Sequence, residues 1–346
     1  MSDKANNTMS LNLKKTSNFI FQYAIYLVFI ILVLIISIME PSFLSFENFR
    51  NILSISATRI IIAMGVGGIL LTGGTDLSAG RQVGLAAVLS SSLLQTSDYA
   101  RRMYPDLPVL PLIVPILIAM IACGALGFLN GLIVSKLKVP PFIATLGMMV
   151  AVYGLNSLYF DRPPYGAQPI GGLDTRFTTL GSGYLGYNNI FSIPFIVIIA
   201  AVIALIWWVL YNKTTFGKNI YAIGGNAEAA KVSGVSVVRN LLIVYTLAGV
   251  MYGLAGTLEA ARTGGATNNY GNGYELDAIA ACVVGGVSTS GGVGTIPGMV
   301  VGVLIFSVIN YGLTFINMSP YWQQIVKGAI IIAAVAIDIR KYLNKR

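Results

Sequence analysis

The chain has 346 residues, of which 55% are hydrophobic and only 10% are charged, and its mean hydropathy is +0.76. Soluble domains carry about a quarter charged residues, so this composition excludes an ordinary soluble protein and favours one solvated by lipid. The sequence contains no histidine and only two cysteines, each inside an apolar stretch. Histidine-assisted catalysis is therefore excluded, and neither a metal site nor a disulfide is expected.

The net charge of +9 is compatible either with a nucleic-acid partner or with the positive-inside bias of membrane proteins. The positions of the basic residues favour the membrane. Thirteen of the 22 lysines and arginines fall in four clusters, namely Lys4, Lys14, Lys15; Lys136, Lys138; Lys213, Lys218, Lys231, Arg239; and Arg340, Lys341, Lys345, Arg346. We expect these segments and both termini to be cytoplasmic, and no nucleic-acid partner.

Ten apolar segments alternate correctly with the basic clusters, and an even number of crossings places both termini on one side. The expected crossings are residues 19–39, 59–73, 79–97, 109–135, 141–160, 190–211, 241–260, 276–289, 296–318 and 321–339. The segments between them at 40–58, 98–108 and 161–189 should then be external.

The sequence thus predicts an all-α integral membrane protein of about ten transmembrane helices. Its parts are a cytoplasmic tail over 1–18, one transmembrane domain over 19–339 and a basic cytoplasmic tail over 340–346. The segments 59–73 and 276–289 are short for a full span.

A faint internal repeat relates residues 60–160 to residues 241–339. Asn130 and Asn310 each precede by ten residues a proline that opens the next expected helix. Because crossing two should run inward and crossing seven outward, crossings 2–5 and 7–10 are expected to be inverted repeats. Transporters often contain such repeats, although so few identities leave a chance match open.

Glycines recur at helical spacing in two of the expected crossings. Gly124, Gly127 and Gly131 lie along one face of the fourth crossing, and Gly249 and Gly253 lie four apart in the seventh. Small faces let helix backbones approach closely in lipid, so we expect a tightly packed bundle.

The segment 212–240 is polar and basic, and it contains a short helix candidate. Asn226 can cap a helix over Ala227 to Lys231, and Gly234 can end that helix in a left-handed conformation. A short helix between two spans is suited to receive a push from a soluble partner. The alternative is a merely solvated loop.

Within this segment, TFGKNIYAIGGNAEAAKVSGV at 215–235 resembles the cytoplasmic coupling loop of permease subunits in bacterial ATP-binding-cassette sugar importers. The loop lacks the Ile-x-Leu-Pro that follows in other importer families. GGTDLSAGRQVGLAA at 73–87 and the segments 266–295 and 320–338 are similar to the ribose, xylose and galactose permeases of this class.

This resemblance implies the importer permease fold in an inner-membrane homodimer. A periplasmic sugar-binding protein would dock outside, and an ATPase subunit would dock on the coupling loops. The loop residues implied to couple to the ATPase are Gly217, Asn226, Glu228, Ala229, Ala230 and Gly234.

The chain is not expected to be an enzyme or to bind a cofactor. It contains no G-x-x-x-x-G-K-[ST] phosphate loop, so ATP and Mg would be used by another chain. The resemblance favours a galactose or methyl-galactoside cargo, with ribose and xylose as alternatives.

Polar and ionisable residues near or inside expected crossings are candidates for the translocation path or its gate, because burying a charge in lipid is costly. The candidates are Asp76, Arg81, Asn130, Glu259, Asn268, Asn269, Glu275, Asp277, Asn310 and Lys327. For Asp76 and Arg81 a structural gating role is favoured over sugar contact. Lys327 can equally snorkel outward.

Two other functional classes fit the sequence less well. A stand-alone secondary transporter would require a deeply buried carboxylate or a broken helix for ion coupling, whereas most acids here fall near expected membrane boundaries. An intramembrane enzyme would require a nucleophile and a base, and the sequence offers no such pair.

Overall fold

The computed structural model describes residues 29–164, 166–186 and 192–343, and the chain divides into two compact units. The large unit comprises residues 46–304, and the small unit combines the described part of 1–45 with 305–346. The helices of the large unit are α2 (Phe46–Leu71), α3 (Ala79–Leu93), α4 (Ile113–Ser135), α5 (Pro141–Phe160), α6 (Thr175–Ser182), α7 (Phe195–Lys213), α8 (Thr215–Gly225), α9 (Ala227–Val232), α10 (Val237–Thr263) and α11 (Tyr274–Val284). Two short strands, β1 (Tyr184–Leu185) and β2 (Ile193–Pro194), pair antiparallel.

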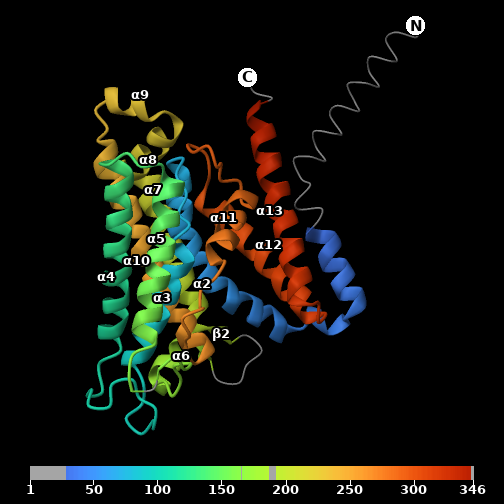
Figure 1. Cartoon of the computed structure of the whole chain (residues 1–346). Helices are drawn as coiled ribbons and strands as arrows, with labels where there is room; N and C mark the ends of the chain where they lie inside the picture. The colour runs from blue at the N-terminus through green and yellow to red at the C-terminus, as the bar shows by residue number, and fades with distance from the viewer. Residues whose placement is uncertain (1–28, 165, 187–191, 344–346) are drawn as a thin grey trace. The chain divides into compact units, whose positions relative to one another are not determined.

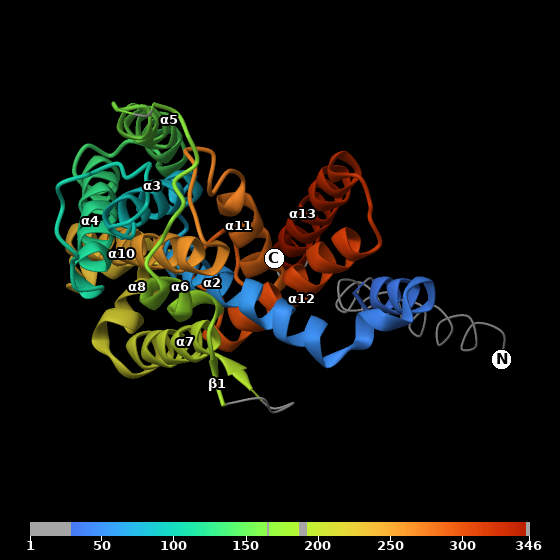
Figure 2. The same cartoon turned by 90° about the horizontal axis from the view of Figure 1, so that it is seen from below.

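Helices α2 and α10 form the centre of the large unit, where α10 packs against α2, α3 and α4 (Figure 2). In their most apolar stretches, 72% of the residues of α2 and 61% of those of α10 are buried, against 22% in α5 and in α7. The outer helices expose large apolar side chains such as Leu158 and Leu205. An apolar surface of this kind is stable in lipid and not in water, which agrees with a membrane protein.

The contact between α4 and α10 depends on the small residues that the glycine spacing indicated. A methyl group added at Gly127 would overlap the carbonyl of Tyr245, and one added at Gly249 would overlap the carbonyl of Cys123. The two backbones therefore touch with no side chain between them. The predicted close packing is confirmed for this pair of helices.

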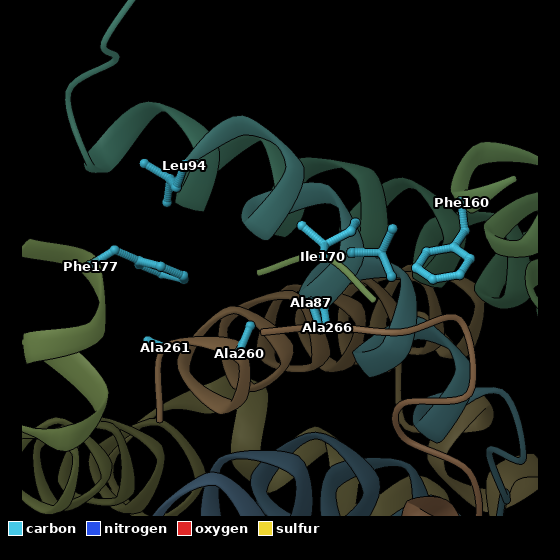
Figure 3. Packing of buried hydrophobic residues seen from close by; sticks show 9 residues of the cluster. Ala87, Leu94, Phe160, Ile170, Phe177, Ala260, Ala261 and Ala266 are labelled. Carbon is cyan, nitrogen blue, oxygen red and sulfur yellow. The ribbon is translucent and has the colours of Figure 1, made fainter. Parts of the chain in front are cut away.

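The two ends of the large unit differ. Helices α8 and α9 lie at one end, and α6 lies at the opposite end (Figure 1). At the α6 end an apolar cluster joins the end of α3, the end of α5, α6 and the end of α10 (Figure 3). The cluster contains Ala87, Val88, Leu94, Phe160, Ile170, Phe177, Ala260, Ala261 and Ala266. The α6 end corresponds to the segments expected outside, and the α8–α9 end corresponds to the expected cytoplasmic segment 212–240.

Six described helices are long and apolar enough to cross a membrane: α2, α4, α5, α7, α10 and α12 (Ile296–Phe315). The chain is therefore a multi-pass membrane protein, but the expected count of about ten full crossings is not confirmed. Helices α3 and α11, with 15 and 11 residues, would reach only about 22 and 16 Å, less than the roughly 30 Å of a hydrocarbon core.

The expected boundaries of the second crossing are wrong. We expected residues 40–58 to be an external segment, but α2 begins at Phe46 and continues for 26 residues. The polar residues that suggested a loop are accommodated within the helix. Ser56 and Thr58 are buried, and the Ser56 hydroxyl donates to the carbonyl of Ile52 at 2.7 Å. Because protein and not lipid covers this face, polar residues are tolerated there.

The small unit contains the helix Phe29–Met39, the 3₁₀ turn η1 (Pro41–Leu44), the later part of α12 and α13 (Pro320–Leu343). Phe43 packs against Phe315 with ring centroids 5.6 Å apart. Helix α13 continues to Leu343, four residues beyond the expected end of the last crossing at 339. The tail 1–18 and the first part of crossing one lie outside the described residues.

Candidate functional site: a surface loop and two half-length helices

The helix predicted within the segment 212–240 is present as α9. The Asn226 side-chain oxygen accepts a hydrogen bond from the amide of Ala229 at 3.0 Å and so caps the helix. Gly234 follows the helix with φ of +88°, the left-handed conformation that favours glycine. The capping and termination signals are therefore confirmed.

A second helix, α8, precedes α9 and was not predicted. Thr214 caps it by accepting from the amide of Gly217 at 3.3 Å, and Ile220 and Ile223 anchor it by burial. Gly217, one of the loop residues implied to couple to the ATPase, is buried against the backbone of Tyr211. Sequence reasoning missed α8 because each of its glycines costs about 1 kcal/mol of helix propensity, and only tertiary packing offsets that cost.

Helix α9 presents one face to the protein and the rest to solvent. Ala230 is buried, whereas Ala229, Glu228 and Lys231 are exposed. Val232 is 89% exposed, the highest value among the large apolar side chains of the described residues. Helix α9 therefore presents an exposed surface with two charged side chains and one protruding aliphatic side chain, which is accessible to a partner.

The first turns of α3 and α11 meet inside the large unit. Arg81 in α3 donates to the side-chain oxygen of Asn272 at 2.9 Å, just before α11. The Arg81 guanidinium also lies over the ring of Tyr153, 4.3 Å from its centroid. Glu275 is 7% exposed, and a methyl group added at Gly80 would overlap its carboxylate. Two half-length helices thus begin at a common polar region.

Asp76 anchors the connection between α2 and α3. One of its carboxylate oxygens accepts from the amide and the hydroxyl of Ser78, at 2.9 and 2.6 Å. Asn130 of α4 donates to the same Ser78 hydroxyl at 3.0 Å, as does Gln82 of α3 at 2.9 Å. Asn130 therefore reaches from α4 to the residue that precedes α3. Asp76 does not bond the first turn of α3 directly but fixes the residue that precedes it.

A second buried polar cluster surrounds Glu259 of α10. Its carboxylate is 2% exposed and contacts Arg262 at 3.0 Å and Arg59 of α2 at 3.7 Å. Thr58 donates to it at 2.8 Å and Tyr274 at 3.2 Å. The Arg59 guanidinium lies 3.3 Å from the centroid of the Tyr274 ring. This cluster joins α2, α10 and the start of α11.

Sequence reasoning did not select Arg59 or Tyr274. Arg59 is an ionisable residue at the start of an expected crossing, so the rule that selected Glu259 would have found it. Nothing in the sequence marks Tyr274, because its place in the cluster depends on the hydrogen bond that its hydroxyl donates to Glu259, 15 residues earlier in the chain.

The remaining candidates are more dispersed. Asn268 donates to Ser157 of α5 at 3.3 Å, and Asn269 accepts from the amide of Asn272 through its carbonyl. Asp277 is half-buried in the first turn of α11. Asn310 and Lys327 belong to the small unit, on α12 and α13. The roles assigned to these residues stay predictions.

Long apolar helices, two half-length helices and an exposed polar loop together define a multi-pass membrane protein. The family described as "Branched-chain amino acid transport system / permease component" matches residues 48–335, and the chain belongs to it. No solved structure was found that matches the chain.

Similar proteins include two named galactose/methyl galactoside import permease protein MglC. The protein from Haemophilus influenzae is 53% identical over 338 residues, covering 97% of this chain and 99% of the relative. The protein from Escherichia coli K12 is 57% identical over 295 residues, covering 85% of this chain and 87% of the relative. The ribose import permease protein RbsC of Bacillus subtilis is 40% identical over 284 residues, 81% of each chain.

Proposed function

We propose that the chain is the transmembrane permease subunit of an ATP-driven, binding-protein-dependent importer that translocates galactose or methyl-galactoside. The observation that carries the proposal is the exposed, capped helix α9, attached to a bundle that contains two half-length helices. The relatives named for galactose and methyl galactoside support this cargo over ribose, since the ribose permease is more distant. Ribose and xylose remain the alternative cargoes.

The proposed assembly contains two copies of this chain in the bacterial inner membrane, with both termini in the cytoplasm. An ATPase subunit binds ATP and Mg and docks on α9, and a periplasmic sugar-binding protein docks at the α6 end. The large unit supports this polarity, because the basic segments 136–138 and 213–239 lie at its α8–α9 end.

The proposed mechanism is alternating access. Closure of the ATPase partners displaces the coupling loops, and the helices of the two copies then open alternately outward and inward. The helix lengths support the predicted internal repeat. In both α2 to α5 and α10 to α13, a long helix is followed by a short one and then by two long ones. High sugar affinity resides in the external binding protein, so the isolated permease should bind sugar weakly.

The test is uptake of radiolabelled galactose by cells that lack this chain and are rescued by wild type or by Glu228→Arg at matched membrane levels. We expect wild type to restore ATP-dependent uptake and Glu228→Arg to lose it, since reversing an exposed charge disturbs docking and not folding. Lys4→Glu, on the same expected side but outside the loop, is the control. Equal rescue by both forms would exclude α9 as the ATPase contact.

A stand-alone secondary transporter is the second candidate, because two observations favour it. Asp76, Glu259 and Glu275 are buried within the protein, so three carboxylates shielded from solvent are present where an ion-coupled carrier would need one. Helices α3 and α11 are also too short to cross a membrane, and ion-coupled carriers often contain helices that do not span it continuously. Uptake that persists without the ATPase subunit and stops when the ion gradient is dissipated would establish this function instead.

A further inference from the structure

The end of α8 forms a three-way contact with two segments distant in sequence, the end of α2 and the connection between α11 and α12. The amide of Gly292 in that connection donates to the carbonyl of Leu71, the last residue of α2, at 2.9 Å. The hydroxyl of Tyr221 on α8 donates to the carbonyl of Gly294 at 3.0 Å. We call the contact of Leu71, Tyr221, Gly224, Gly292 and Gly294 the α8 joint.

Gly224 lies in the middle of the α8 joint, where there is no room for a side chain. A methyl group placed there would overlap both the carbonyl oxygen of Leu71 and the amide of Gly292. The next residue, Gly225, has open space where its side chain would be. These two adjacent glycines thus differ in whether the place that a side chain would take is already filled by another segment.

Each segment at the α8 joint is connected along the chain to one of the half-length helices. Leu71 is followed by residues 72–78, which enter α3, and Gly292 lies eight residues after Val284, the last residue of α11. Arg81, in the first turn of α3, contacts Asn272, which precedes α11 at the end opposite to Gly292. The α8 joint is therefore the place where the surface loop touches the chain leading to both helices.

Contacts of this type transmit displacement well. The polypeptide backbones touch directly, with no flexible side chain to absorb a shift, and close-packed interiors are hardly compressible. Small movements at one site become larger rearrangements when packed elements have two discrete arrangements. Helix α9, which offers the docking surface, follows α8 after the single residue Asn226.

We propose that the α8 joint passes the displacement of the coupling loop to α3 and α11 together, with Gly224 and Tyr221 as positioning residues that touch neither sugar nor nucleotide. The inference rests on the proposed function and deepens it. Docking on α9 provides the push, and the α8 joint directs it to the polar region where the two half-length helices begin. Loss of the α8 joint should therefore uncouple ATP hydrolysis from transport without releasing the ATPase subunit.

The experiment uses the complete importer in proteoliposomes, with radiolabelled galactose as the probe, and records sugar transported per ATP hydrolysed. Gly224→Ala is compared with Gly225→Ala, which adds the same methyl group one residue away. We expect Gly224→Ala to lower the ratio at least about fivefold, the lower end of ordinary coupling between sites, while Gly225→Ala matches wild type. The amount of bound ATPase subunit should be equal in all three.

Tyr221→Phe provides an independent reading, because it removes one hydrogen bond and keeps the ring. If Gly224→Ala does not reach the membrane, the ratio measured with Tyr221→Phe decides whether the α8 joint couples ATP hydrolysis to transport. A reduced ratio with normal ATPase binding supports the α8 joint, and an unchanged ratio overturns it. Equal ratios in Gly224→Ala and Gly225→Ala overturn it as well. Failure of wild type to transport galactose would instead contradict the proposed function, so the two failures are distinguishable.

Discussion

The buried cluster around Glu259 and the exposed helix α9 use the same side chain, a glutamate, for opposite purposes. Glu259 is 2% exposed and meets two arginines, a threonine and a tyrosine from three helices. Glu228 is exposed on a six-residue helix whose surface faces solvent. Burial decides the role of the charge. The interior carboxylate stabilises the arrangement of helices, and the surface carboxylate is available to a partner.

The largest effect is expected from Glu259→Ala. The substitution removes the buried carboxylate that the half-buried Arg59 and Arg262 share, and because these arginines keep some contact with solvent we expect a loss of about 3 kcal/mol, the lower end of the roughly 3–5 kcal/mol for a fully buried pair. Thermal unfolding of the purified protein in detergent would measure the loss. Glu228→Ala is the control and should change stability by less than about 0.5 kcal/mol. If the two variants unfold at the same temperature, Glu259 does not stabilise the arrangement of the helices more than Glu228 does.

The next effect concerns binding. Val232→Asp places a charge on the most exposed apolar side chain of α9, and we expect at least about tenfold weaker capture of the ATPase subunit, as for a central interface residue. Stability should be unchanged. The control is Leu185→Asp, a similar change on an exposed strand at the α6 end. Equal capture by both variants would remove Val232 from the docking surface.

A smaller effect is expected from loss of the α9 cap. Asn226→Ala removes the acceptor for the amide of Ala229 and should destabilise α9 locally by about 1 kcal/mol. Amide hydrogen exchange within 227–232 should accelerate accordingly, while exchange in α10 stays constant. Asn226→Asp, which retains a capping oxygen, should restore slow exchange. Persistence of wild-type exchange in Asn226→Ala would show that packing alone holds α9.

The smallest effect lies at the α6 end. Asp174 caps α6, and hydrogen bonds from the Arg176 side chain hold the pKa of this carboxyl below its ordinary value. A lowered folded-state pKa stabilises α6 above the unfolded value of about 3.9, and this contribution is lost as pH falls further. Hydrogen exchange in α6 should therefore accelerate in acid, and Asp174→Asn should abolish that dependence. Identical pH profiles in both proteins would contradict it.

Local sequence signals predicted local structure well. The prolines at 140 and 141 indicated the start of α5, and its predicted bounds, 141–160, agree with the structure. The capping residue Asn226 and the terminating residue Gly234 likewise predicted α9. These signals succeed because each acts within a few residues of the backbone that it constrains.

Other features depended on partners that sequence reasoning could not supply. Helix α8 forms despite its glycines because Leu71 and Gly292 surround its end. The outer part of α2 looked like a polar loop because the protein that buries Thr58 is α10, 201 residues away at Glu259. The segment 276–289 was expected to be short for a full span, as α11 is, but the short length of α3 was missed, because the uncharged residues that follow it look like a continuation of the helix.

The sequence by itself determined that the chain is a multi-pass membrane protein, that 212–240 is a polar loop with a capped helix, and that it resembles sugar permeases. Composition, charge position and capping residues suffice for these features because each is a sum over neighbouring residues. Only the tertiary structure decided that Arg59 pairs with Glu259, that α3 and α11 begin together and that Gly224 touches two distant segments. Those contacts exist because folding brings residues from about 70 to 200 positions apart into van der Waals range, where their mutual burial outweighs what each segment prefers alone.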